Sequence, residues 1–435
     1  MKKEIIDEGR GSRVESQKGP SRQLAVDSRR SALDSVKGHR PSTLDPRLAK
    51  TPVFVGCGFA AKYPEGGGNF SVPLQYVTGL KRMPGFRGIW LEVLQGSGDP
   101  LKDAHCVRTF QRRMAAYDLE YCLLLRPVQK EKGPEGHELE AMQVFGMSMA
   151  TLRELAGEGV LLNLSYSVKP PLTNLFGRRL LCSLDPTEVL YWMDQIEMGQ
   201  SCHDEFWSIG LCMDAISPVL PKPIVPWKSY FPLVDTELLK PQPRPLSPPK
   251  PRFTTIGQWY WDGSITIGGE WRDYSKQAAF APYLDLPRQV PEAIFELAMN
   301  LNPDDPERER LRSLGWKVVT PHRLTRTPSA YYRYLSGATA EFTAVKLEAQ
   351  MGSGWLSDRA AAFLALGRPV VTEPTGAERF LPEESGMLFV SNLEGAIEAS
   401  RRVLKDWPKL SRAARSAAVE CFDSVRNLKL LLGMK

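Results

Sequence analysis

The segment AEFTAVKLEAQMGSGWLSDRAAAFLALGRPVVTEPTG, residues 340–376, carries the pattern that decides the fold. Residues 342–345 form a short strand-like segment, and residues 359–366 form an apolar run that predicts a helix ended by Gly367. A second apolar strand begins at Pro369. Strand, helix and strand in this order predict an α/β fold with a parallel sheet.

A glycine-serine loop precedes the predicted helix. Gly352, Ser353 and Gly354 form the loop, and Ser357 with Asp358 supplies a helix cap and an acidic first turn. Backbone N–H groups converge at such a loop and the helix dipole favours negative charge, so the pattern predicts a phosphate site. From spacing alone, an ordinary loop between a strand and a helix remains the alternative.

The whole segment resembles a known nucleotide-sugar motif. The order Gly-Ser-Gly-Trp-x-Ser, helix, Gly-x-Pro-Val-Val and Thr-Gly is similar to the donor site of glycosyltransferases with the GT-B fold, most of all a bacterial group-1-like branch. Weaker similarity extends from about Val53 to the C-terminus and leaves out the first fifty residues. The resemblance implies a donor site made of Arg272, Lys276, Glu341, Lys346, Gly352, Ser353, Gly354, Trp355, Ser357, Asp358, Arg359, Thr375 and Gly376. Arg272 and Lys276 are four residues apart at a loop or helix start and would share one helical face, a geometry able to hold a diphosphate. We expect Asp358 to cap the helix or to contact a ribose.

The chain between residues 51 and 94 repeats the strand-loop-helix-strand pattern, which predicts a Rossmann-like domain. The resemblance implies that Gly66, Gly67 and Gly68 form a loop facing the cleft between two domains, whereas a plain tight turn is the alternative. A later predicted strand ends in Asp185, which places a carboxylate at the carboxyl edge of the sheet, where α/β folds bind ligands.

Residues 203–210, HDEFWSIG, resemble a second signature of the same branch. The resemblance makes His203 and Asp204 candidates for the base that would activate an acceptor. For His203, a hydrogen-bonded structural role is the alternative.

The predicted fold class is therefore α/β of the GT-B type, with two Rossmann-like domains facing across a cleft. Six prolines predict a stiff linker at residues 241–251. It separates an acceptor-side domain, residues 51–240, from a nucleotide-sugar-binding domain, residues 252–410. The resemblance implies that helices in residues 411–435 cross back to the first domain. Residues 1–50 lack aromatic residues and apolar periodicity, so we predict a disordered tail.

Composition narrows the class of protein. Residues 1–50 hold 12 Lys and Arg against 7 Asp and Glu, a net of +5 out of +6, so the rest of the chain is close to neutral and predicts no nucleic-acid partner. The start of the sequence is polar, and no run of about 18 apolar residues occurs, so we expect neither a signal peptide nor a transmembrane segment. Seven scattered cysteines without a CxxC pair are typical of a cytoplasmic protein.

The resemblance implies a glycosyltransferase of the hexosyltransferase type, which moves a sugar from a nucleoside diphosphate sugar to an unidentified acceptor. Basic side chains would stabilise the leaving diphosphate, and we expect no metal and no cofactor. The sequence does not match the family's patterns of carboxylates at the donor site. Glu341 and Glu348 are separated by six residues instead of seven, and Gly352 and Ala360 stand where plant-type members have His and Glu. A binding or scaffold protein without catalysis, or a nucleotide-sugar epimerase, are the alternatives.

Overall fold

The computed structural model describes residues 50–128, 139–216, 220–243, 250–261, 264–346 and 351–434. The predicted tail, apart from Lys50, and the middle of the predicted linker lie outside these residues, as does Glu348.

The first half of the chain forms an eight-stranded sheet in the order β4-β3-β2-β1-β5-β6-β7-β8. All neighbours are parallel except β3 and β4. The strands are β1 (Thr51–Cys57), β2 (Phe86–Gln95), β3 (Glu120–Arg126), β4 (Gln143–Phe145), β5 (Val160–Leu164), β6 (Arg178–Ser183), β7 (Glu205–Ser208) and β8 (Trp227–Ser229).

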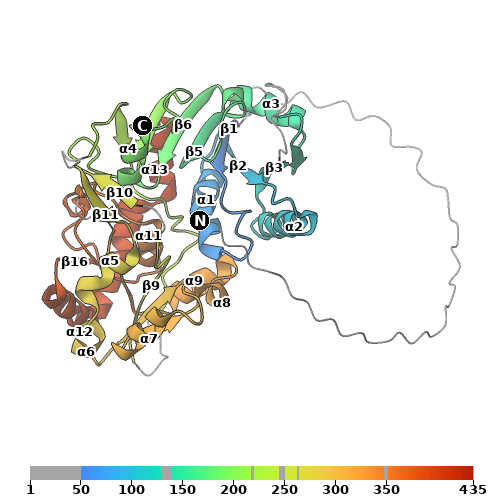
Figure 1. The fold of residues 1–435 in the computed structure, drawn as a ribbon. Coiled ribbons are helices and arrows are strands. Elements are labelled where there is room, and N and C mark those ends of the chain that lie inside the picture. Colours follow the sequence, from blue (N-terminus) through green and yellow to red (C-terminus); the bar gives the residue numbers. More distant parts are fainter. Residues whose placement is uncertain are drawn as a thin grey trace, which may run out of the picture. The chain divides into compact units, whose positions relative to one another are not determined.

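Helices cover both faces of this sheet, because its central strands are apolar on both sides. Val53 and Val55 of β1 face a core shared with α1 (Gly67–Lys81) and α2 (Pro100–Ala116), whereas Phe54 faces the opposite side. That opposite side is covered by α3 (Met149–Gly157), the 3-10 turn Thr173–Leu175 and, beside β6 and β7, α4 (Pro186–Met193). Figure 1 shows these elements in blue and green.

The second half forms a six-stranded parallel sheet in the order β13-β12-β9-β14-β15-β16. Its strands are β9 (Arg252–Gly257), β12 (Ile294–Met299), β13 (Lys317–Val319), β14 (Ala340–Phe342), β15 (Val370–Thr372) and β16 (Met387–Phe389). Its helices are α5 (Lys276–Phe280), α6 (Leu286–Gln289), α7 (Pro306–Ser313), α8 (Pro321–Leu324), α9 (Pro328–Ser336), α11 (Asp358–Ala365) and α12 (Leu393–Ala417). A separate hairpin, β10 (Ser264–Ile267) and β11 (Glu270–Asp273), lies between β9 and α5 in the sequence.

The strand predicted at residues 342–345 begins two residues earlier than expected. It is β14, and it ends at Phe342 because its pairing with β9 and β15 stops there.

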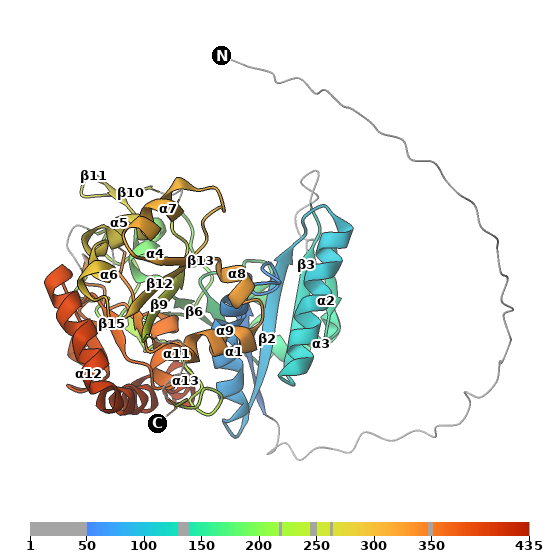
Figure 2. The same ribbon diagram turned by 90° about the horizontal axis from the view of Figure 1, so that it is seen from below.

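The last helix crosses back to the first sheet, as the sequence predicted. After α12, a short π-helical turn at Ala418–Phe422 leads into α13 (Ser424–Leu432), which packs on α1 (Figure 2). A Cβ built at Gly79 of α1 would lie 2.6 Å from Ser424 Oγ, so the two helices approach closely there. Leu428 and Leu431 of α13 are fully buried in the core of the first sheet.

Arg368, in the GRPVV part of the motif, is fully buried and anchors the start of the linker region. Its guanidinium donates hydrogen bonds to the carbonyl oxygens of Ser336, Gln242 and Pro243 at 2.7 to 3.1 Å. A planar guanidinium presents several donors in fixed directions, so one side chain satisfies carbonyl groups from two separate segments.

Candidate functional site

The predicted donor motif lies at the carboxyl ends of β9, β14 and β15. The side chain of Ser357 caps α11, and its Oγ accepts a hydrogen bond from Ala360 N at 3.0 Å. The cap fixes where the helix starts, and the rest of α11 is buried. Asp358, expected either to cap this helix or to contact a ribose, is therefore not the cap.

Two cationic side chains converge on one hydroxyl group at the end of β14. Lys276 Nζ lies 3.4 Å and Arg359 Nη2 lies 3.2 Å from Thr343 Oγ1. Lys276 is buried and also donates to the carbonyl oxygen of Ala344. The side chain of Ser275 caps α5 and thereby sets Lys276 as the first residue of that helix.

A buried carboxylate orients the second of these cations. Glu341 is fully buried, and its Oε1 accepts a hydrogen bond from Arg359 Nε at 2.5 Å. Arg359 Nη1 donates to the carbonyl oxygen of Ile256 at 2.8 Å. Arg359 therefore joins the amino end of α11 to β9 and β14, and much of its hydrogen-bonding capacity is used within the protein.

Glu373, which follows β15, was missed by the sequence reasoning. Its carboxylate accepts hydrogen bonds from Val345 N at 2.6 Å and from the hydroxyl of Tyr283 at 3.0 Å. Burial raises its pKa, and the charge of Lys276 opposes that rise. Its position at the end of a predicted strand was the available signal.

Several buried polar atoms of this region have no hydrogen-bond partner among the described residues. Eleven buried side-chain atoms lack a partner in the whole described part of the chain, and four of them belong to residues that the sequence assigned to the donor site. The four are Arg272 Nε, Glu341 Oε2, Ser353 Oγ and Asp358 Oδ1. Buried polar groups normally have partners, so these four atoms are candidates to bond a ligand.

Arg272 and Lys276 do not share a helical face, which corrects that prediction. Arg272 lies in β11 and pairs with Glu270 at 2.6 Å, whereas α5 begins only at Lys276. The buried Ile265 and Ile267 of β10 favour a hairpin over a continued helix in this segment. Lys346, also assigned to the donor site, stacks its Nζ over the rings of Tyr274 at 4.4 Å and Trp261 at 4.7 Å.

The glycine-serine loop is docked on the first domain. Leu211 N donates to Gly354 O at 3.2 Å, and Cys212 N donates to Ser353 O at 3.1 Å. Gly210 and Trp355 form an antiparallel bridge. The indole N–H of Trp355 donates to the carbonyl oxygen of Leu184 at 3.0 Å. Thr375 and Gly376 complete this contact, because Gly354 N donates to Thr375 O and Gly376 lies beside Cys212.

This docking corrects the reason proposed for Gly354. A Cβ at Gly354 would lie 2.7 Å from Cys212 N, so the glycine makes room for the protein backbone. At Gly352, which also has a positive φ, a Cβ would meet no described atom within 4 Å. Gly352 is the loop glycine that is open to a ligand.

The second glycine loop, Gly66–Gly68, was expected to face the cleft between the domains, and in the structure it packs directly against the second domain. Gly67 N donates to Thr325 O at 2.8 Å, and a Cβ at Gly67 would lie 2.3 Å from Thr327 O. The ring of Tyr331 covers Gly68, and Gly66 N bonds to the carbonyl of Tyr63. These glycines let α1 and the α8–α9 region approach each other.

His203 is not positioned as a base in this structure, which corrects the catalytic prediction. It is buried on the side of the sheet opposite α1, against Tyr166 and Phe206. Its Nδ1 donates to the carbonyl oxygen of Gly199 at 2.7 Å, and its Nε2 accepts from Asn163 Nδ2 at 3.0 Å. Burial lowers its pKa. Both ring nitrogens are occupied, as the structural alternative required.

Asp204 is likewise at the wrong edge of the sheet. It directly precedes β7, so it lies at the amino end of that strand, whereas α/β sheets bind ligands at the carboxyl ends. Its carboxylate pairs with the Arg179 side chain at 2.7 and 3.1 Å, and these hydrogen bonds lower its pKa. The pair is structural.

Asp185 lies at the carboxyl edge of the first sheet. It comes two residues after the end of β6 and directly precedes α4, but its side chain does not cap that helix. The preceding residue, Leu184, receives the indole hydrogen bond of Trp355. The sequence placed a carboxylate at this edge but did not assign it to the site.

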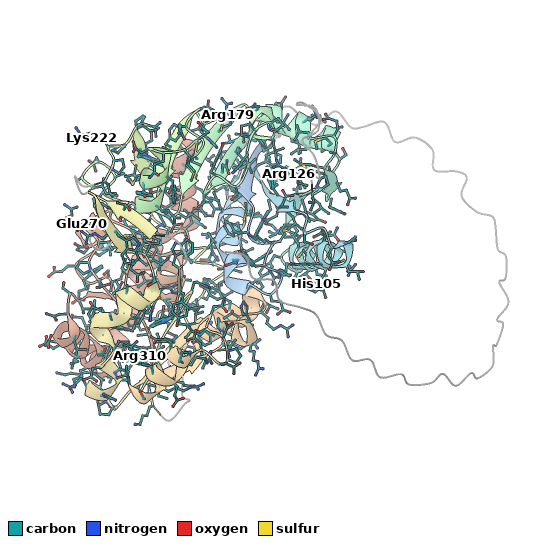
Figure 3. The ribbon with its side chains drawn as sticks, viewed as in Figure 1. His105, Arg126, Arg179, Lys222, Glu270 and Arg310 are labelled. Carbon is teal, nitrogen blue, oxygen red and sulfur yellow. The ribbon has the colours of Figure 1, made fainter. Side chains whose placement is uncertain are left out.

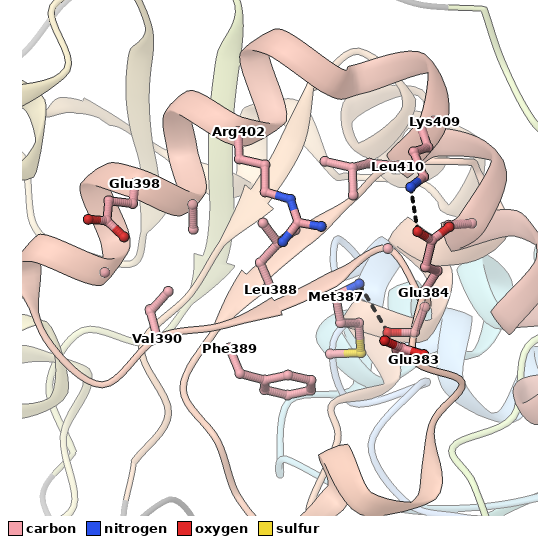
Figure 4. A pocket seen from close by; sticks show the side chains of 15 residues that line it. Glu383, Glu384, Met387, Leu388, Phe389, Val390, Glu398, Arg402, Lys409 and Leu410 are labelled. Carbon is pink, nitrogen blue, oxygen red and sulfur yellow. Dashed lines mark hydrogen bonds and ion pairs between the residues drawn. The ribbon is translucent and has the colours of Figure 1, made fainter.

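The pocket beside the edge strand β16 contains none of the residues predicted for the site. It has a volume of about 470 Å³ and is lined by residues of β16 and α12, including Leu388, Arg402 and Leu410 (Figure 4). Lys409 pairs with Glu384 at its margin.

No family model and no curated protein matches this chain. Solved structures do match it. The Anabaena protein HepE in complex with UDP and glucose is 10% identical, with a TM-score of 0.51, and the match covers 88% of this chain and 98% of that chain. An alpha-glucosyltransferase, AGT, in complex with UDP is 11% identical, with a TM-score of 0.51 and the same coverage. An alpha-glucosyltransferase bound to UDP-glucose and DNA containing an abasic site is 11% identical, with a TM-score of 0.52.

The chain has the GT-B fold. Two parallel sheets and a C-terminal helix that contacts α1 confirm the predicted fold class. At this level of identity the GT-B likeness establishes the fold alone, so activity is argued below from the residues.

Within the described residues, no helix is long and apolar enough to span a membrane. The same part of the chain contains no group of three or more His, Cys, Asp or Glu side chains arranged to hold a metal ion. All seven cysteines are buried and unpaired.

We predict that Gly354→Ala destabilises the protein much more than Gly352→Ala. Both glycines have φ near +70°, so both variants carry the same backbone strain, but only Gly354 would also force a Cβ against Cys212 N. We expect an additional loss of about 1–3 kcal/mol in the free energy of unfolding for Gly354→Ala, measured by urea denaturation. Equal losses for the two variants would show that the loop does not dock on the first domain.

We predict that Asp358 makes the stability of the ligand-free protein fall as the pH rises. Burial raises its pKa to about 7, well above the ordinary value for an aspartate, so between these two values the folded state keeps a proton that the unfolded state has lost. The stabilising free energy that comes from this retained proton is fully present below about pH 4, and it is lost as the pH rises to about 7.

Asp358→Asn mimics the protonated form, and we expect its free energy of unfolding to exceed that of the wild type by about 1–3 kcal/mol at pH 8 and by less at pH 5. Urea denaturation of both proteins at both pH values measures this difference. A difference that does not change with pH would contradict the prediction.

Proposed function

We propose that this chain is a glycosyltransferase that moves a sugar from a nucleoside diphosphate sugar to an acceptor, without a bound metal. The observation that carries the proposal is the convergence of Lys276 and Arg359 on Thr343 at the carboxyl end of β14. Cations at this edge of an α/β sheet are suited to a diphosphate. Proteins with the same fold that are solved with UDP or UDP-glucose support this choice of ligand.

The residues around these cations fit the parts of such a donor. Lys276 would stabilise the charge that develops on the leaving diphosphate. The open side of Gly352 and the amino end of α11 would offer backbone N–H groups to phosphate oxygens. Ser353 Oγ and Asp358 Oδ1, which lack partners among the described residues, would bond to hydroxyl or phosphate oxygens of the donor.

Asp358 suits a ribose hydroxyl better than a phosphate. A carboxylate beside a diphosphate is repulsive, whereas a carboxyl group whose pKa is raised to about 7 can donate or accept a hydrogen bond near neutral pH. The role proposed here agrees with one of the two roles expected from the sequence.

Asp185 replaces His203 and Asp204 as the proposed base. It follows β6 at the carboxyl edge of the first sheet, one residue from the contact between Leu184 and Trp355 of the donor loop. A carboxylate there would accept the proton of an acceptor hydroxyl as that hydroxyl attacks the sugar.

The first test is Lys276→Ala. We expect it to weaken the binding of a nucleoside diphosphate by about 1.5–3 kcal/mol, the range for a charged hydrogen bond, and to leave nucleoside binding nearly unchanged. Titration calorimetry would use the nucleotide chosen from a thermal-shift panel of UDP-, GDP- and dTDP-sugars. Lys102→Ala, on the exposed side of α2, is the control. Equal losses for nucleotide and nucleoside would remove Lys276 from the phosphates.

The second test is Asp185→Asn, which keeps the shape of the side chain and removes its basicity. We expect turnover of the radiolabelled donor to fall at least 100-fold, in line with the loss of a general base, with donor affinity unchanged. Asp118→Asn, at an exposed pair with Lys81, is the control. Wild-type protein that binds the donor but never turns it over would favour the scaffold alternative, and interconversion of free nucleotide sugars would favour the epimerase.

A further inference from the structure

The hairpin β10–β11 is attached to both sides of the proposed donor site. The chain leaves the carboxyl end of β9 at Gly257, forms the hairpin, and returns at Ser275 and Lys276. The hairpin therefore leads directly into Lys276 of the proposed diphosphate site. Figure 1 shows the hairpin in yellow beside α4.

One face of the hairpin is fixed by packing. Ile265 and Ile267 are buried in a cluster with Leu220, Tyr274 and Met351, the residue that precedes the glycine-serine loop. Ile267 also lines a pocket whose wall on the other side is α4, and the backbone N–H of Thr266 lies 3.4 Å from the hydroxyl of Tyr191 in α4. The hairpin therefore reaches from the second domain to the first.

The pocket between the hairpin and α4 is large enough for a small ligand. Its volume is about 640 Å³, within the range of about 300–1,000 Å³ that is usual for small-molecule sites. Its polar lining includes Tyr191, Asp194, Gln195, Lys222 and Thr266. Lys222, labelled in Figure 3, and Asp194 are both exposed and carry opposite charges.

Trp271 lies on β11, outside the lining of this pocket, and is 65% exposed. It lies directly opposite Thr266 in the hairpin, so the two side chains share the outer face of the pair. Exposure of the apolar indole ring to water is unfavourable, and the ring offers a flat apolar surface on which another ring can stack.

We infer that this pocket, with Trp271, binds the acceptor and that the acceptor is a carbohydrate. A pyranose ring has an apolar C–H face that stacks on an indole and hydroxyl groups that bond to amide, carboxylate and ammonium groups. A nucleic acid would require a basic lining, whereas the two charges of this lining cancel. A lipid chain would require a mostly apolar lining, whereas polar and apolar residues alternate here in about equal number, which suits the polar and apolar parts of a sugar. The assignment as acceptor site rests on the proposed transferase function, because an acceptor must lie beside the donor.

The experiment compares wild type, Trp271→Ala and Trp271→Phe on a printed array of neutral and acidic oligosaccharides, followed by titration with the best-bound oligosaccharide. We expect Trp271→Ala to lose at least tenfold in affinity and Trp271→Phe, which keeps a stacking ring, to stay within threefold of wild type. Leu101→Ala, an 80% exposed residue of α2, is the control and should match wild type. The thermal shift produced by UDP, GDP and dTDP is measured on the same samples.

Wild type that binds no oligosaccharide, or Trp271→Ala that binds as tightly as wild type, would overturn the inference. Preferential binding of duplex DNA or of vesicles containing a polyprenyl phosphate would also overturn it. If the carbohydrate inference fails but a nucleotide still raises the melting temperature, the proposed donor site stands. Oligosaccharide binding that depends on Trp271, with no nucleotide shift, would keep the carbohydrate site and overturn its role as an acceptor site.

Discussion

The backbone pairing between Leu211–Cys212 and Ser353–Gly354 is the constraint on which the candidate site depends. It joins the loop after β7 of one sheet to the loop after β14 of the other, so each domain positions the other domain's edge. Backbone hydrogen bonds tolerate little displacement, because their strength falls steeply with distance and angle. The glycine-serine loop is therefore held by the first domain as well as by its own sheet.

Glycine has the same physical role at two of the contacts between the domains. At Gly67 and at Gly354, the missing side chain leaves room for backbone atoms of the other domain within about 3 Å. Glycine also lets a phosphate approach the backbone, so a glycine-rich loop in a sequence does not distinguish a ligand from another part of the chain. The structure separates the two uses, because Gly352 is the one glycine of these two loops at which an added Cβ would meet no described atom within 4 Å.

The sequence predicted the fold well because the fold rests on local patterns. The helix α11 follows from Ser357, the apolar run and the final glycine, all within ten residues. The site residues were harder to predict, because their roles depend on partners far away in the sequence. His203 is satisfied by Asn163, forty residues earlier, and Asp204 by Arg179, so neither partner could be read from the HDEFWSIG signature. Arg272 was misplaced because a hairpin replaces the expected helix.

The charges at the end of β14 explain why this edge suits an anion. Lys276 and Arg359 approach the same hydroxyl, and two like charges in a partly dry site repel each other unless negative charge is near. Glu341 pairs with Arg359 and offsets that charge. Burial raises the pKa of Glu373, and the positive charge of Lys276 opposes that rise, so these two side chains interact as well. A diphosphate that enters here would be attracted by both cations, and the exclusion of water on binding would strengthen that attraction.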